Sequence, residues 1–105
     1  MAPPLGAHVS IAGGMKRAIP RGEEIACDAV QVFVKNASQW QGKPLDDEDV
    51  EAFRIAHRDS PIGPLVAHAS YLINLAATNS NNLQKSRTAL IDEIERCDRL
   101  GIPSL

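Results

Sequence analysis

Three short apolar runs alternate along the chain with three longer segments in which apolar residues recur at helical spacing. The runs are Leu5–Val9, Ala29–Val34 and Leu65–Ala67. Each is bounded by polar, glycine or proline residues, which is typical of a buried β-strand rather than of a helix. Alternation of this kind predicts a parallel sheet with helices packed outside it.

The three helical segments have recognisable boundaries. The first covers residues 15–26, and Pro20 inside it predicts a kink or a late start of the helix. The second helix is expected to begin after Asp46, which is a good N-cap, and to end before the Ser-Pro-Ile-Gly-Pro segment at 60–64. The third is expected to follow a capping segment at 78–82 and to end at Gly101. Its expected apolar stripe consists of Leu83, Leu90, Ile94, Cys97 and Leu100.

A parallel sheet with outer helices closes as a (β/α)₈ barrel or stays open as a doubly wound sheet. The glycine fingerprint of a dinucleotide-binding fold is absent, since Gly13-Gly14 alone is a weak signal. A (β/α)₈ barrel typically needs about 250 residues. Three strands alone would also leave a bare sheet edge and unburied apolar helix faces. A barrel would therefore be incomplete at 105 residues.

Composition narrows the class of protein further. The chain is 44% hydrophobic, which fits an ordinary globular domain. Its net charge of −2 does not by itself indicate a nucleic-acid-binding protein. Its two cysteines lie far apart without a CxxC spacing, so we expect reduced thiols rather than a disulfide or a cysteine zinc site. No signal peptide or membrane-spanning run is evident. A cytoplasmic location is the expectation.

Polar residues follow each predicted strand, at the place where parallel α/β proteins carry their chemistry. His68 ends the third run and is the candidate metal ligand; the alternative is a histidine held by a hydrogen bond in a loop. A zinc site needs three or four ligands, and His8 is the only other well-placed histidine. His57 is expected on the surface of the second helix.

Two loops next to these strand ends have alternative interpretations. Asn36, Gln39 and Trp40 suit contact with a sugar–phosphate backbone and with stacked bases, unless Trp40 simply packs over the rim of the fold. Tyr71 and Leu72 could wedge into a DNA base stack, or both could pack on the next helix. No GxSxG elbow, P-loop or catalytic carboxylate pair is present, and the acidic run at 46–51 is expected to be helix-start chemistry.

Three ordered segments together resemble the endonuclease IV family of apurinic/apyrimidinic endonucleases. They are Gly6–Gly14 (GAHVSIAGG), Phe33–Trp40 (FVKNASQW) and His68–Leu75 (HASYLINL), and residues 85–97 are similar as well. The resemblance implies a zinc-dependent (β/α)₈ TIM barrel of which residues 1–105 are the N-terminal part of one domain. It also implies a monomeric enzyme of base-excision repair that cuts duplex DNA 5′ to abasic sites.

The resemblance also assigns roles to residues. It implies a trinuclear Zn²⁺ cluster with His68 as one ligand, and no other ligand of the cluster and no catalytic residue lies in this chain. His8 is a site-lining residue, and Ser38 stands where some members carry an arginine. The DNA-contacting positions that it implies are Gly13, Gly14, Asn36, Gln39, Tyr71 and Leu72.

The sequence leaves two other functions open. One is a sugar-isomerase-like barrel, which also carries strand-end histidines and binds divalent metals. The other is a small non-catalytic binding module that folds alone. Because one histidine cannot hold a cluster, we expect no catalysis from the 105 residues by themselves.

Overall fold

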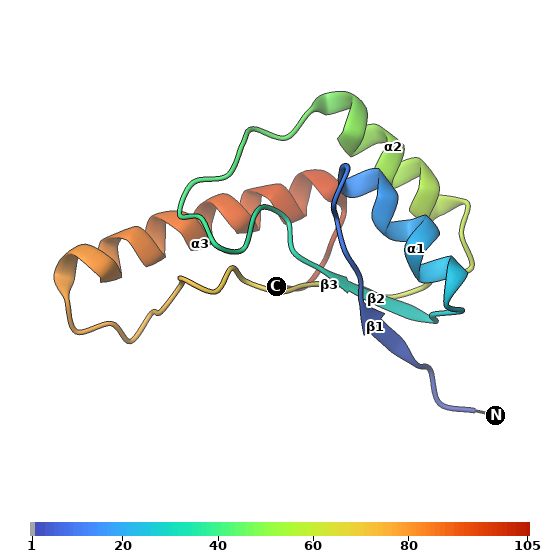
Figure 1. The fold of residues 1–105 in the computed structure, drawn as a ribbon, viewed down its shortest axis with the longest axis horizontal. Helices are drawn as coiled ribbons and strands as arrows, with labels where there is room; N and C mark the ends of the chain where they lie inside the picture. The colour runs from blue at the N-terminus through green and yellow to red at the C-terminus, as the bar shows by residue number, and fades with distance from the viewer. Residues whose placement is uncertain (1) are drawn as a thin grey trace.

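Three β/α units follow one another along the chain, as Figure 1 shows. The computed structural model describes residues 2–105. A 3₁₀ turn at Met15–Arg17 precedes the first helix. The elements are β1 (Gly6–His8), α1 (Ala18–Glu24), β2 (Ala29–Val32), α2 (Asp47–Arg58), β3 (Leu65–Ala67) and α3 (Ser80–Leu100). The predicted alternation of strand and helix is confirmed.

The strands form one parallel sheet in the order β1-β2-β3. The register places His8 beside Gln31, and Gln31 beside Val66. The free edge of β3 is partly covered by the C-terminal residues, because the backbone N–H of Ala67 donates to the carbonyl of Ser104 at 2.8 Å. The last residues thus lie where a fourth strand of a barrel would pair.

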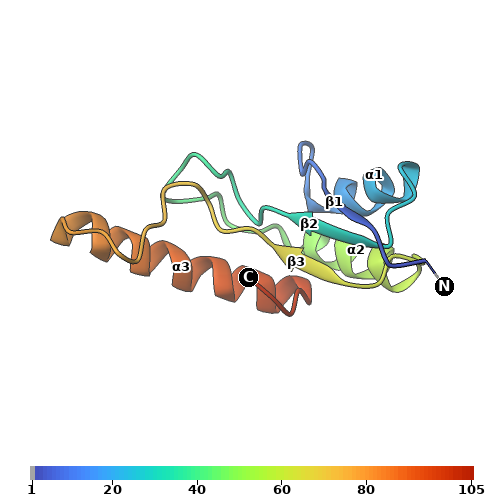
Figure 2. The ribbon, with the colours of Figure 1, turned by 90° about the horizontal axis from the view of Figure 1, so that it is seen from below.

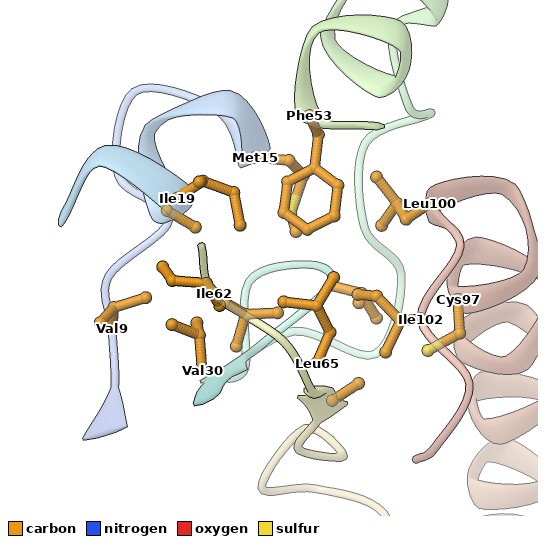
Figure 3. Packing of buried hydrophobic residues seen from close by; sticks show 14 of the residues in the cluster. Val9, Met15, Ile19, Val30, Phe53, Ile62, Leu65, Cys97, Leu100 and Ile102 are labelled. Atoms are coloured by element: carbon orange, nitrogen blue, oxygen red, sulfur yellow. The ribbon is translucent and has the colours of Figure 1, made fainter. Parts of the chain in front are cut away.

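The helices cover one face of the sheet only. Val30 and Leu65 point toward them and pack with Phe53 and Leu100, as Figure 3 shows. Complete burial of a side chain such as Phe53 contributes about 1.5–3 kcal/mol to folding. The opposite face carries His8, Gln31 and Val66, of which Val66 remains 38% exposed. In a closed barrel this second face is the interior.

Helix α1 starts late, as Pro20 predicted. Pro20 is its third residue, where a backbone N–H would lack a partner inside the helix anyway. The predicted extension to residue 26 is wrong. Ala26 has a φ of +59°, a left-handed conformation that ends the helix, and Ile25 is exposed instead of facing the core.

The caps of α2 and α3 follow the sequence. Asp46 accepts a hydrogen bond from the backbone N–H of Glu48 at 3.0 Å, and Gly101 ends α3 with a φ of +76°. Helix α3 begins at Ser80, earlier than expected, because Asn79 caps its first turn. The predicted stripe is also wrong at Ile94, which is 51% exposed. The buried residues of α3 are instead Ser86, Ala89, Glu93, Arg96, Cys97 and Leu100.

Both cysteines are free thiols, with Cys97 buried and Cys27 partly buried. Within residues 2–105, none of the helices has the length and apolar character needed to cross a bilayer.

Candidate metal and nucleic-acid site

Four rings from three separate segments meet at the carboxyl ends of the strands. His8 ends β1, Phe33 directly follows β2, and His68 directly follows β3. The ring centroid of Phe33 lies 4.6 Å from that of His8, 5.1 Å from that of His68 and 5.2 Å from that of Tyr71, all edge-to-face. The two imidazoles are 6.1 Å apart. The parallel register thus brings the predicted strand-end residues together.

The exposed ring of His68 is oriented by its own backbone. Its Nδ1 lies 2.6 Å from the carbonyl oxygen of Ala69, so Nδ1 carries a proton that it donates. In the neutral ring the lone pair is then on Nε2, which makes no hydrogen bond within residues 2–105. A carbonyl behind Nδ1 and an open Nε2 form the usual arrangement of a metal-ligating histidine.

His8 is held differently. Its Nδ1 lies 2.9 Å from Nε2 of Gln31, which donates to it. Burial lowers the pKa of His8, and so does the nearby His68. A neutral His8 lines the site without adding a positive charge close to His68.

The fit of this site to zinc is partial. The donor chemistry of His68 suits the metal, because an uncharged imidazole nitrogen at an exposed strand end is a common zinc ligand. Across the described residues 2–105, however, no group of three His, Cys, Asp or Glu side chains lies together in a way that could hold a metal ion. His68 is therefore one ligand of a set that these residues do not complete.

A groove of about 930 Å³ lies beside the rings, between the β1–α1 loop (9–14) and the β2–α2 loop (33–46). Its lining includes His8 and Phe33. Four of the predicted DNA-contacting residues line it, namely Gly13, Gly14, Asn36 and Gln39. The other two, Tyr71 and Leu72, are not among its lining residues and belong to the β3–α3 loop (68–79).

The glycine pair shapes the β1–α1 loop. Gly13 and Gly14 have φ values of +88° and +121°, which L side chains rarely adopt. A Cβ on Gly14 would lie 3.1 Å from Oδ1 of Asp49. That carboxylate accepts the backbone N–H groups of Met15 at 2.8 Å and Lys16 at 3.0 Å, which ties the loop to α2. Gly14 therefore has a structural reason to be glycine, whatever it contacts.

In the β2–α2 loop, Asn36 supports the turn and Gln39 is free to reach outward. Oδ1 of Asn36 accepts the backbone N–H of Ser38 at 2.9 Å, while the side chain of Gln39 is exposed. Trp40 is half-buried, with Nζ of Lys85 lying 5.9 Å from its ring centroid. The structure favours packing against α3 for Trp40 over stacking on a base.

Tyr71 presents its side chain to solvent. It is 69% exposed, and its ring meets Phe33 and His68 rather than α3. Leu72 is 37% exposed. Of the two alternatives for Tyr71, packing on the next helix is not what the structure shows.

A buried polar cluster behind these loops was missed by the sequence reasoning. It consists of Lys35, Ser70, Glu93 and Arg96, and all four are buried. Arg96 donates to the carbonyl oxygens of Val34 at 3.3 Å and Lys43 at 2.7 Å, and to Asp92 at 2.8 Å. The signal lay in helical spacing, since Ser86, Glu93 and Leu100 recur every seven residues on one face of α3.

Parallel strands that alternate with helices are the arrangement of a segment of a (β/α)₈ barrel. Comparisons with known proteins identify the same fold. Residues 20–105 match a family model described as a xylose isomerase-like TIM barrel. The chain belongs to that family. The fold class predicted from the sequence, the first units of a TIM barrel, is thereby confirmed.

Individual relatives are more specific. The chain is 52% identical over 103 residues to a "Probable endonuclease 4" of Halorhodospira halophila, covering 98% of this chain and 35% of that protein. A protein of the same name from Chloroflexus aurantiacus is 47% identical and is covered to 36%. The crystal structure of endonuclease IV from Thermus thermophilus superposes with a TM-score of 0.89 at 37% identity, covering 95% of this chain and 38% of that one.

These matches confirm the resemblance to endonuclease IV that the three motifs indicated. The chain spans about a third of the length of the curated relatives that it matches. Within the barrel family, this chain is thus similar to endonucleases.

Proposed function

We propose that residues 1–105 form the N-terminal β/α units of a zinc-dependent DNA repair endonuclease that hydrolyses the phosphodiester 5′ to abasic sites. The observation that supports this best is the open Nε2 of His68 beside the exposed ring of Tyr71. A metal ligand and an exposed aromatic at the carboxyl end of a parallel sheet suit a macromolecular substrate that is cut there.

The proposed roles follow from position. His68 contributes one ligand to a trinuclear zinc cluster, and its Nδ1–H bond to Ala69 keeps the ring oriented toward the strand ends. Bound zinc polarises phosphoryl oxygens and lowers the pKa of water. Tyr71 and Leu72 insert where a base is missing, since little stacking has to be broken there.

The groove provides the backbone contacts. Asn36 and Gln39 carry amide groups that can donate to phosphate oxygens, and the backbone of Gly13-Gly14 can approach a phosphate closely because it carries no side chain. His8 lines the space between this groove and the metal ligand. Duplex DNA with an abasic site is the proposed partner.

The chain alone is proposed to be inactive, because His68 is one ligand where zinc needs three or four. The test is a nicking assay on an abasic duplex with added zinc. It compares residues 1–105 with a hybrid in which they replace the matching part of the Thermus thermophilus enzyme. We expect incision by the hybrid only. Robust cleavage by the purified chain, or a folded hybrid that leaves the duplex intact, would contradict the proposal.

A metal-dependent sugar isomerase is the second candidate, because the family model describes a xylose isomerase-like barrel. A strand-end histidine suits that chemistry too. The exposure of Tyr71 and Leu72 favours the nuclease, since a small sugar needs an enclosed pocket rather than protruding side chains. Aldose turnover by the hybrid without incision of DNA would reverse this preference.

A cytoplasmic location and a monomeric state complete the proposal. The two free cysteines fit a reducing compartment. Light scattering of the hybrid on a sizing column tests the oligomeric state, and a dimer mass would contradict the monomer.

A further inference from the structure

Helix α3 is much longer than the strands beside it. Its 21 residues span about 31 Å at 1.5 Å per residue, whereas the four residues of β2 span about 13 Å. Of α3, only Cys97 and Leu100 near its end join the apolar core cluster beside the sheet. The helix up to Arg96 therefore extends past the strands, and Figure 2 shows the β3–α3 loop running beside it. A helix face that covers loops meets backbone N–H and C=O groups rather than apolar side chains, which explains why this part of α3 buries polar residues.

Glu93 is the centre of that polar face. It is 1% exposed. Its Oε1 accepts the backbone N–H of Ser70 at 3.0 Å, and its Oε2 accepts the Ser70 hydroxyl at 2.9 Å. The same Oε2 lies 3.5 Å from Nζ of Lys35, which in turn donates to the carbonyl of Trp40 at 2.6 Å. One carboxylate thus connects the β3–α3 loop to the β2–α2 loop.

Further contacts hold the two loops at a fixed separation. The backbone N–H of Tyr71 donates to the carbonyl of Ala37 at 2.9 Å, which joins the loops directly. The hydroxyl of Ser86 accepts the backbone N–H of Asn74 at 2.9 Å, which holds the far end of the β3–α3 loop on α3. Every buried side-chain polar atom in the part of the chain that the structure describes has a partner.

A buried ion pair of this kind is a poor way to gain stability. Removing two charges from water costs several kcal/mol per ion, and well-packed apolar residues often serve burial equally well. What a fully satisfied polar cluster adds is a defined geometry. The Lys35–Glu93 pair is therefore better explained by the loops that it holds than by the free energy of folding.

We propose that Glu93 is a positioning residue that sets the spacing between the β2–α2 loop and the β3–α3 loop, and hence between Gln39 and Tyr71 where they meet DNA. The inference rests on the proposed function and extends it to residues that do not touch the substrate. Glu93 acts through its contacts with Lys35 on one loop and Ser70 on the other.

Glu93→Gln separates the contact with Ser70 from the contact with Lys35. The amide keeps an oxygen for the N–H of Ser70 but removes the carboxylate charge that faces Lys35, so the attachment of the β2–α2 loop is weakened selectively. Trp40 is the only tryptophan of the chain and reports on that loop. In the 105-residue chain we expect acrylamide quenching of Trp40 to rise about twofold or more with unchanged far-UV circular dichroism. Glu95→Gln makes the same change at an exposed position of α3 and should leave quenching unchanged.

The second readout is kinetic and uses the hybrid enzyme on an abasic duplex. Glu93→Gln should raise KM about tenfold and leave kcat within about twofold, because contacts to bound DNA are misplaced while the metal ligand is untouched. Lys35→Met should reproduce both effects, so the inference remains testable if Glu93→Gln folds poorly.

The outcomes are distinguishable. If the variants lower only the melting temperature, while Trp40 quenching and KM match those of Glu95→Gln, Glu93 has a purely structural role and the inference is overturned. If the unmutated hybrid does not cut abasic DNA, the proposed function fails, and the Trp40 measurements still decide whether Glu93 holds the loops together.

Discussion

Replacing Gly14 with alanine should destabilise the protein by about 2–4 kcal/mol. Gly14 has φ +121° and ψ +157°, a region that only glycine occupies readily, and such strain costs about 1–3 kcal/mol. The new Cβ would also lie 3.1 Å from Oδ1 of Asp49. Displacing that carboxylate weakens its bonds to the N–H groups of Met15 and Lys16, each worth about 1.5–3 kcal/mol because the acceptor is charged.

Urea unfolding followed by circular dichroism at constant m-value measures this cost. Gly63→Ala is the matched control, because its Cβ would meet only the carbonyl of Asp28 at 3.7 Å, and its φ is not positive. It should change the free energy of unfolding by less than about 0.5 kcal/mol. In an Asp49→Ala background the cost of Gly14→Ala should shrink by about 0.5 kcal/mol or more, since the two residues are in contact. Equal stability of the Gly14 and Gly63 variants, or strict additivity with Asp49→Ala, would refute this reasoning.

Three further predictions follow from single contacts. Tyr71→Ala in the hybrid should weaken binding to an abasic duplex about 5- to 150-fold in a titration by fluorescence anisotropy, with little change in melting temperature, because the ring is exposed. Cys97 should react far more slowly with iodoacetamide than Cys27 in the folded chain, since burial, and then a neighbouring carboxylate on α3, raise its pKa; equal rates in a mass-spectrometric time course would contradict this. Arg96→Met should cost about 2–4 kcal/mol in urea unfolding, whereas Arg87→Met at an exposed position should cost less than about 0.5 kcal/mol.

Helix ends were predicted well where the signal is a capping residue that acts on neighbouring backbone groups. Asp46 and Gly101 fixed helix ends because caps are satisfied by neighbouring backbone groups. The left-handed turn at Ala26 escaped prediction because residue preference does not favour alanine there. It closes a Schellman motif, in which the backbone N–H of Cys27 donates to the carbonyl of Gly22 and that of Ala26 to the carbonyl of Glu23, each at 3.0 Å. A Cβ on Gly22 would lie 2.6 Å from Cγ2 of Val30, which shows how closely α1 and β2 approach.

In the candidate site, too, one part could be predicted from the sequence and another part could not. The parallel order of strands was enough to predict that His8 and His68 end on one edge of the sheet. Glu93 shares a helix face with Leu100 by its spacing, but a search for apolar residues at that spacing passes over it because such a search assumes that a buried helix face is apolar. Glu93 is buried against loops, and which loops lie there depends on α3 extending past the strands.

The most direct test of the account is the zinc content of the hybrid enzyme together with its incision of an abasic duplex, measured for His68→Ala and His57→Gln. His57 lies on α2 and bonds to the carbonyl of Gly63, away from the strand ends. His68→Ala should lose zinc and at least about a hundredfold in incision rate, while His57→Gln keeps both. A folded His68→Ala hybrid with full zinc content and undiminished incision would contradict the assignment of His68 as a ligand, and with it the central claim.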